Sequence, residues 1–388
     1  MACPGGGGRP VARPFRSEAA KLVVELHPEP LLAAPLFSLA GDLSQLHFHL
    51  SLRNASGTPL ALERLELRLR RRGRLLLRQE LSAELLARRL RAVPWVSVRD
   101  RQSLAAAAHD QAALGRAKGD SLLGPGESAS LPHQVLVLRP DEEPDELQLQ
   151  IDLAGGAAVQ RSFAVSSHAQ LTSLRLPVDG RWWVMQGHRF DEEHAAGEAL
   201  PSQSFAYDLG VLGADGRTYR GDPLRNASYF AHGRPVLAMA DGEVVRVQDG
   251  LPENEPVGRR PSWEQVLRRP EDLAGNFVVL RHRGGEHSAY LHLQPGLSLA
   301  TGARVRAGQP LGRCGNSGNS LEPHLHVQLQ DGPDPLRAAG LPARFADFTL
   351  ELGHLELHVR QPRPLPALLV VQPGRSAGAS ELSPLPRR

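Results

Sequence analysis

The sequence predicts an all-β protein, with a β-sandwich in the N-terminal half and an antiparallel β domain in the C-terminal half. The first reason is that short runs alternate apolar and polar residues and end in turn residues, as half-buried strands do. The second is the presence of 38 glycines and 32 prolines in 388 residues, which suits a protein of many strands and turns.

The strand patterns divide the chain into parts. Residues 1–18 are expected to form a disordered leader, and residues 19–167 the β-sandwich. Residues 174–350 are expected to form the second β domain, in which the stretch 251–274 interrupts two strands as a surface loop. The strand pattern is mostly lost after Pro364, so a mostly disordered tail is expected over residues 364–388.

Two runs illustrate the sandwich strands. The run "LSQLHFHLSLRNASG" alternates and ends in a turn, and its His47 and His49 have no acidic or histidine companion nearby, which indicates solvent-facing side chains. The run "LERLELRLRRRGRLLLRQELS" alternates leucine with charge and breaks at Gly73, which predicts a half-buried hairpin. Its arginine face is interpreted as solvated, and an anionic polymer is the alternative partner.

Charge and composition exclude some classes of protein. The 45 basic residues are nearly cancelled by 42 acidic ones, which does not indicate nucleic-acid binding. Cys3 and Cys314 lie far apart, so no disulfide framework is expected. No apolar run is long enough for a transmembrane helix, and the first residues contain no apolar core of signal-peptide length.

Several histidines and one aspartate stand out in the second domain. In "PHLHVQL", His324 and His326 alternate with apolar residues, so both imidazoles project from one strand face. Asp208 lies in the apolar strand "SFAYDLG", and His292 ends the strand in "AYLHLQPG". Imidazole and carboxylate are zinc ligands, and a catalytic zinc keeps one position open for water. A metal site is therefore one interpretation, but the spacing alone is weak evidence for it, because His47 and His49 form the same His-x-His pattern. The remaining candidates are His188, His194 and His232.

The ordered motifs "PVLAMADGEVVRV", "GNFVVLRH", "YLHL", "GARVRAGQPLGRCGNSGNS" and "PHLHVQL" resemble the lysostaphin-type zinc metallopeptidases, the glycyl-glycine endopeptidase family. The resemblance covers about residues 175–345. It implies an antiparallel β-sheet groove fold and zinc-dependent hydrolysis of peptide bonds in peptidoglycan cross-bridges. It also implies a location in the cell envelope or outside the cell, although no signal peptide is visible in the chain.

The resemblance also implies roles for single residues. Asp208 and His326 would be zinc ligands, and His324 and His292 would flank the metal-bound water as general base and transition-state stabiliser. The family's first histidine ligand stands four residues before the aspartate, where this chain has Ser204. Because "QSFAYD" is similar to an element whose bearers carry an upstream histidine, His194 is expected to be the third ligand, with His188 behind it. A solvated loop histidine is the alternative interpretation of His194.

The leading functional hypothesis is a zinc-dependent endopeptidase. The alternative is a catalytically inactive groove domain that binds peptide or cell wall and regulates a partner hydrolase. A purely structural β protein is disfavoured because the aspartate and the histidines occur together in family order. "GNSGNS" fits neither a serine-nucleophile motif nor a phosphate loop, and no H-E-x-x-H occurs. Cys314 is interpreted as a small strand-end residue rather than a thiol nucleophile. The pair Trp182 and Trp183 has two interpretations, the wall of a groove or the core.

Overall fold

The computed structural model describes residues 21–27, 31–39, 41–92, 117–139, 142–187, 200–374 and 380–381. Strands dominate these ranges, and their α-helices are short, so the prediction of an all-β chain is confirmed. No helix in the described ranges is long and apolar enough to cross a membrane. The predicted leader, residues 1–18, lies outside them.

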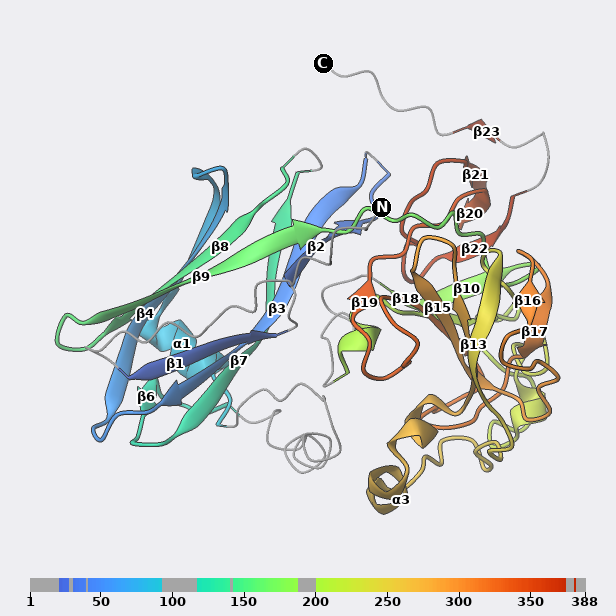
Figure 1. The fold of residues 1–388 in the computed structure, drawn as a ribbon, viewed down its shortest axis with the longest axis horizontal. Coiled ribbons are helices and arrows are strands. Elements are labelled where there is room, and N and C mark those ends of the chain that lie inside the picture. The colour runs from blue at the N-terminus through green and yellow to red at the C-terminus, as the bar shows by residue number, and fades with distance from the viewer. Residues whose placement is uncertain are drawn as a thin grey trace, which may run out of the picture.

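The N-terminal half contains one hydrogen-bonded sheet. Its strands are β1 (Leu22–His27), β2 (Leu31–Leu36), β3 (Leu43–Asn54), β4 (Leu60–Arg71), β5 (Arg74–Ser82), β6 (Leu122–Leu123), β7 (Ser128–Leu138), β8 (Glu146–Leu153) and β9 (Ala158–Ser167), and helix α1 (Ala83–Arg89) follows β5. Their order is β1-β3-β2-β9-β8-β4-β5, with β6 on β4 and β7 on β3. The parallel pair of β2 and β9 joins the two parts of this sheet, which appear on the left of Figure 1.

Alternating side chains from both parts of the sheet share one core. Phe48 and Leu50 of β3 and Leu67 and Leu69 of β4 are fully buried in the same apolar cluster. The predicted hairpin is present as β4 and β5. Its charged face is not wholly solvated as expected, because the carboxylate of Glu66 is buried there and paired with the side chains of Arg68 and Arg78.

The prediction that His47 and His49 face solvent is wrong. His49 is fully buried and His47 is half-buried. The ring centroid of His133 on β7 lies 5.1 Å from that of His49 and 5.9 Å from that of His47. The backbone N–H of His133 donates to His49 Nδ1 at 3.1 Å. Burial first, and then the neighbouring His133, lower the pKa of His47 to about 3. Burial also lowers the pKa of His133, so the rings of His47 and His133 pack together in the neutral form.

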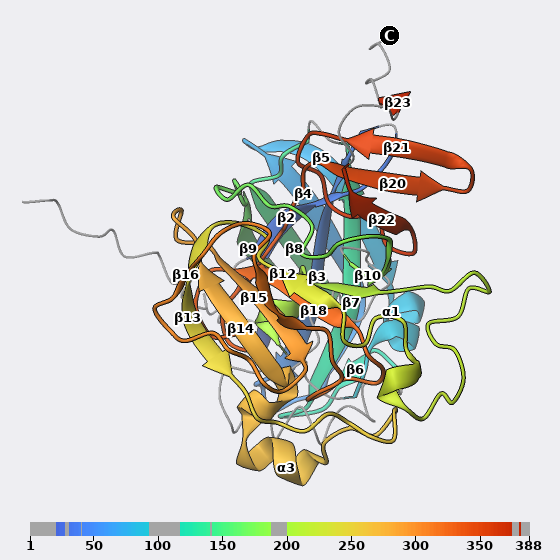
Figure 2. The same cartoon turned by 90° about the vertical axis from the view of Figure 1, so that its right-hand side faces the viewer.

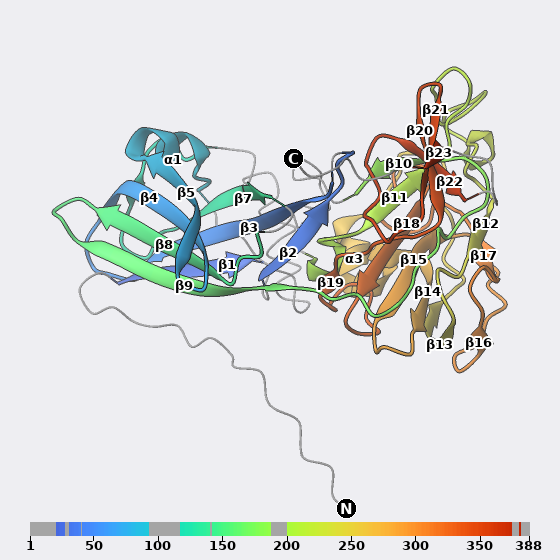
Figure 3. The same ribbon diagram turned by 90° about the horizontal axis from the view of Figure 1, so that it is seen from above.

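The C-terminal half contains a second sheet of strands. They are β10 (Trp182–Gln186), β11 (Tyr207–Gly210), β13 (Gly242–Gln248), β14 (Asn276–Arg281), β15 (His287–Leu293), β16 (Arg304–Val305), β18 (Leu325–Gln330), β19 (Gly340–Leu341), β20 (Phe348–Leu352), β21 (Leu355–Val359), β22 (Val370–Pro373) and β23 (Ser380–Glu381). The order is β16-β13-β14-β15-β18-β11-β10-β22-β20-β21-β23, with β19 on β18. Figure 3 shows β15, β18 and β11 side by side in its right-hand part.

Shorter elements complete this half. The strands β12 (Pro235–Leu237) and β17 (Pro310–Arg313) pair with each other in a small separate sheet. Helix α3 (Trp263–Arg268) and the 3-10 helices η1 (Pro201–Gln203), η2 (Asn226–Ser228) and η3 (Pro270–Ala274) lie in the connections.

Two expectations for this half need correction. The stretch 251–274 is not only a surface loop, because it contains α3 and η3 and buries Val266 and Leu273 in an apolar cluster. The sheet also continues past residue 350 into β20, β21 and β22, which lie at one end of it (Figure 2). Val371 of β22 is fully buried, so this part of the expected disordered tail is an ordered strand. The domain boundaries themselves stay a proposal.

The two halves are connected by specific contacts. Arg363 binds the carboxylate of Asp42 and lies over the ring of Phe37, 4.4 Å from its centroid. Residues 168–181 form the linker between β9 and β10. The buried carboxylate of Glu286, between β14 and β15, accepts hydrogen bonds from the backbone N–H of Leu171 at 3.0 Å and of Thr172 at 2.7 Å in this linker. These contacts hold residues of the linker against the C-terminal sheet.

Candidate active site

The candidate site begins with the pairing of β11 and β18. These strands are antiparallel, and Asp208 lies directly opposite His326 in their register. Because strand side chains alternate, Tyr207 and Leu209 enter the core while Asp208 points to the other face. Adjacent strands thus bring together two polar residues that are 118 positions apart in the sequence.

The distances define a compact cluster. Asp208 Oδ1 lies 3.0 Å from His326 Nδ1 and 3.3 Å from His324 Nε2. The ring centroid of His292 lies 5.0 Å from that of His324 and 5.7 Å from that of His326. All four side chains are largely buried. The structure therefore brings together the predicted residues Asp208, His292, His324 and His326, while their roles remain a proposal.

A backbone irregularity aims His292 at the cluster. The register of β14 and β15 shifts between Asn276 and Val278, so β15 carries an extra residue near its end. His292 lies in that bulge with φ of +62°, a left-handed conformation that costs a non-glycine residue about 1–2 kcal/mol. Strain of this kind is typical of functional sites.

Backbone carbonyls set the tautomers of two histidines. His292 Nδ1 donates to the carbonyl of Ser317 at 2.8 Å, and His324 Nδ1 donates to the carbonyl of Glu322 at 2.7 Å. In the neutral rings, Nε2 is then the nitrogen with the lone pair. Burial and the neighbouring histidines hold the pKa of His292 well below its usual value. Burial also lowers the pKa of His324, but the Asp208 carboxylate outweighs this and raises it to about 9.

The glycine- and serine-rich loop supports His292. Ser317 Oγ donates to the carbonyl of Leu293 at 2.8 Å and accepts from the N–H of Asn276 at 2.9 Å. Gly318 has φ of +76° and lies so close to Gly275 that a side chain there would collide with its backbone. Ser317 is therefore a buried support for the loop, which agrees with excluding it as a nucleophile.

The stretch 251–274 braces the same loop through Glu253. The carboxylate of Glu253 accepts from the N–H of Asn316 at 2.9 Å and lies 3.1 Å from His232 Nε2. His232, one of the sequence candidates, thus belongs to this support and not to the cluster around Asp208. Alternation did not reveal this role, because Glu253 lies outside the strands.

The donor atoms fit a zinc ion in part. Two ligands of a tetrahedral zinc at about 2.0–2.2 Å are separated by about 3.3–3.6 Å, and Asp208 Oδ1 lies within 3.0 Å of His326 Nδ1. However, the described residues contain no group of three or more His, Cys, Asp or Glu side chains that could hold a metal. The expected third ligand, His194, and its substitute His188 lie outside the described residues. Ser204 is buried, and a neutral hydroxyl is a poor zinc ligand.

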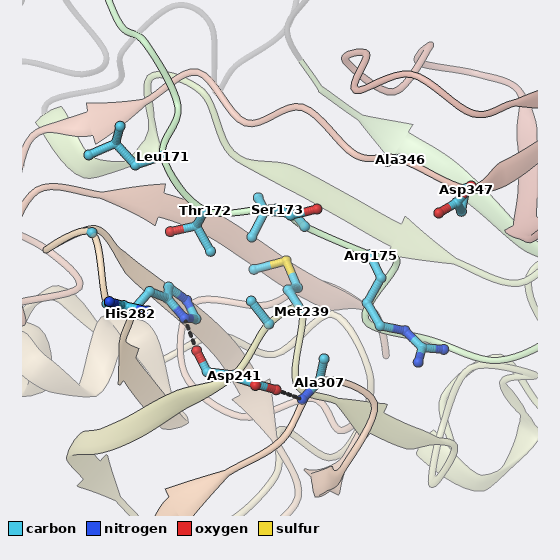
Figure 4. A pocket seen from close by; sticks show the side chains of 14 residues that line it. Leu171, Thr172, Ser173, Arg175, Met239, Asp241, His282, Ala307, Ala346 and Asp347 are labelled. Atoms are coloured by element: carbon cyan, nitrogen blue, oxygen red, sulfur yellow. Dashed lines mark hydrogen bonds between the residues drawn. The ribbon is translucent and has the colours of Figure 1, made fainter.

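Other candidates lie away from the cluster. Cys314 is fully buried, and burial raises the pKa of its thiol, which favours its interpretation as a small packing residue over a nucleophile. Trp182 is also fully buried and donates to the carbonyl of Asp179, so it belongs to the core. A cavity of about 470 Å³ lies elsewhere, beside Thr172, Arg175 and His282 (Figure 4). None of the clustered site residues lines it.

Residues 227–338 match the model of peptidase family M23. This range includes His292, His324 and His326. The chain therefore contains a peptidase family M23 domain, and the predicted resemblance to the lysostaphin-type peptidases is confirmed.

Curated relatives agree with this family. The chain is 37% identical to the peptidoglycan DD-endopeptidase ShyA of Vibrio cholerae over 79 residues, and these residues make up 20% of this chain and 18% of that protein. It is 44% identical to the peptidoglycan DD-endopeptidase ShyC of the same species over 106 residues, and these residues make up 27% of this chain and 19% of that protein. The chain thus spans about a fifth of the length of these relatives. The catalytic domain of lysostaphin from Staphylococcus simulans gives a TM-score of 0.23 at 18% identity, covering 42% of this chain and 88% of that one.

Proposed function

We propose that this protein is a zinc-dependent endopeptidase that cleaves peptide bonds of peptidoglycan in the cell envelope or outside the cell. The observation that carries the proposal is the convergence of Asp208 and His326, with an oxygen and a nitrogen 3.0 Å apart, beside the buried rings of His292 and His324. The M23 match over residues 227–338 supports the reaction class. The names of ShyA and ShyC support peptidoglycan as the substrate.

The zinc would be held by Asp208 and His326, with His194 as the third ligand. Bound there, zinc would polarise the substrate carbonyl and lower the pKa of water towards about 7. His324 and His292 exchange protons at Nε2, because the Nδ1 atom of each ring is engaged by a backbone carbonyl. One ring accepts the proton of the nucleophile and the other donates to the oxygen that gains charge. Burial of both rings keeps bulk water away from these transfers.

A second candidate is the inactive groove domain that binds peptide or cell wall and regulates a partner hydrolase. It is favoured by Ser204 at the position of the family's first ligand and by the lack of a three-residue ligand group within the described ranges. The two candidates differ in zinc binding and in the release of peptidoglycan fragments.

The deciding experiment measures both on one protein preparation. Zinc is quantified by elemental analysis after dialysis, and purified peptidoglycan is incubated with the protein and analysed by mass spectrometry for released peptides. Wild type is expected to retain zinc and release fragments, and His326→Ala is expected to do neither. His354→Ala, at an exposed position on the β20–β21 turn, is the matched control. A wild-type protein that retains no zinc and sediments with peptidoglycan without cleaving it would establish the binding module instead.

A further inference from the structure

A ladder of buried amides continues from His326 along β18. His326, Gln328 and Gln330 project from the same face of this strand, and each is at most 1% exposed. His326 Nε2 lies 2.9 Å from Gln328 Oε1. Gln328 Nε2 donates to Gln330 Oε1 at 2.5 Å, and Gln330 Nε2 donates to the carbonyl of Gly332 at 2.6 Å.

Two backbone carbonyls determine the direction of the ladder. The carbonyl oxygen of Pro335 lies 3.0 Å from Gln328 Nε2, and a carbonyl only accepts hydrogen bonds. If the Gln328 amide were flipped, its oxygen would face this carbonyl and one buried acceptor would oppose another. The carbonyl of Gly332 fixes the Gln330 amide in the same way. Gln328 must therefore present its oxygen, not its nitrogen, to His326.

We propose that Gln328 and Gln330 form a positioning ladder that keeps a hydrogen on Nε2 of His326 and thereby directs its Nδ1 lone pair towards Asp208. The significance for zinc rests on the proposed function, whereas the hydrogen on Nε2 follows from the ladder alone. Histidine ligands of metals commonly donate their other ring N–H to an acceptor that fixes the ring. In a neutral ring, Nδ1 then faces a carboxylate oxygen at 3.0 Å, an arrangement of two acceptors that a bound cation stabilises.

The ladder also distinguishes His326 from His324. His324 Nδ1 is bound to the carbonyl of Glu322, so its Nε2 atom is the one near Asp208. His326 has the opposite arrangement, with Nδ1 near Asp208 and Nε2 engaged by Gln328. The two histidines of one strand face thus turn different ring nitrogens towards Asp208, and different acceptors hold them. This difference gives each ring a separate predicted response when its acceptor is removed.

The test uses the full chain with Gln328→Met, which keeps the length of the side chain and removes the acceptor. Gln330→Met is the graded variant, because Gln328 then retains the carbonyl of Pro335. Gln372→Met is the matched control, since Gln372 is a buried glutamine of β22 in the same sheet. Thermal melting verifies folding of each variant. Long-range nitrogen–proton NMR of histidine-labelled, metal-free protein reads the ring nitrogens, and chelator competition measures zinc affinity.

Wild type is expected to carry a hydrogen on Nε2 of His326, and Gln328→Met is expected to lose this preference. Its zinc affinity should fall about 10–100-fold, the usual effect of removing such a partner, with a smaller loss for Gln330→Met and none for Gln372→Met. A metal-free wild type whose His326 Nε2 lacks hydrogen would overturn the ladder, whatever the zinc result. Unchanged zinc affinity in Gln328→Met would overturn its role towards the metal. A wild type with the expected tautomer that binds no zinc would instead refute the proposed zinc peptidase.

Discussion

Lowering the pH from 6.5 to 4.5 is expected to loosen the packing of β3 against β7, because the folded environment disfavours the protonated form of His47. The ring lies against His49 of its own strand and His133 of β7, and burial is the main reason why its pKa falls to about 3. The arginines Arg89 and Arg91 beside His133 lower the pKa of that ring as well, after burial. A positive charge is therefore disfavoured on both His47 and His133.

The sign and magnitude follow from proton linkage. The unfolded chain protonates His47 near pH 6.5 and the folded chain only near pH 3, so the unfolded state binds more protons between these values. Stability is then lost as the pH falls from 6.5 towards 3, by up to about 1.4 kcal/mol per pH unit. Over two units, and discounted because His47 is only half-buried, the loss is about 2 kcal/mol. That corresponds to an about 30-fold larger equilibrium population of the opened strands.

Hydrogen exchange followed by mass spectrometry measures this loss on peptides that cover β3 and β7. After correction for the intrinsic exchange rate, the wild type should lose about 30-fold protection between pH 6.5 and 4.5. His47→Gln removes the titrating group and should show a much smaller loss, whatever its stability at pH 6.5. His354→Gln, at an exposed position, should behave as wild type. Parallel losses in wild type and His47→Gln would refute the reasoning.

The remaining predictions concern the site and the linker. His324→Ala should keep zinc and lose nearly all cleavage, whereas His326→Ala should lose both; equal loss of zinc from the two variants, measured by elemental analysis, would contradict these roles. His194→Ala should weaken zinc binding at least about tenfold, or about 1.4 kcal/mol, in chelator competition; wild-type affinity would shift the assignment to His188, tested by His188→Ala. Glu286→Gln should speed proteolytic cleavage of the linker, because one oxygen acceptor replaces a carboxylate bound by Leu171, Thr172 and His168, with the exposed Glu264→Gln as control. Burial raises the pKa of Glu286, but hydrogen bonds from His168 and Thr172 outweigh this effect and lower the pKa to about 2. The anchoring of the linker in the wild type should therefore weaken as the pH falls from about 4.5 towards 2. The anchoring in Glu286→Gln should not change over this range.

Alternation along single strands carried most of the correct sequence predictions. It placed His324 and His326 on one face, and the same alternation extends to Gln328 and Gln330, although no prediction was made for these two glutamines. Alternation could not predict which strand pairs with β18, because Asp208 lies 118 residues away from His326. Only the resemblance to a family united these residues before the structure was known.

The failures share a physical cause. His47 and His49 were expected in solvent because their neighbours in sequence are not histidines, yet the ring that covers them belongs to His133, 84 residues from His49. The strand β22 follows a run without clear alternation, and both of its neighbours in the sheet, β10 and β20, are needed to explain its burial. Contacts between distant strands decide such cases, and short patterns do not encode them.

The distribution of costly features argues for a site on this face of the C-terminal sheet. His292 is held in a left-handed backbone conformation, and His326, Gln328 and Gln330 are buried where apolar residues would pack without any need for partners. A structural strand gains nothing from such residues, because each buried polar group must be hydrogen-bonded to avoid a cost of about 1–3 kcal/mol. Here the buried groups are hydrogen-bonded in an arrangement that leaves one nitrogen of His326 and one of His324 beside the same oxygen of Asp208. That concentration disfavours a purely structural protein, and a groove that only binds peptide does not need two rings that turn different nitrogens to one carboxylate oxygen.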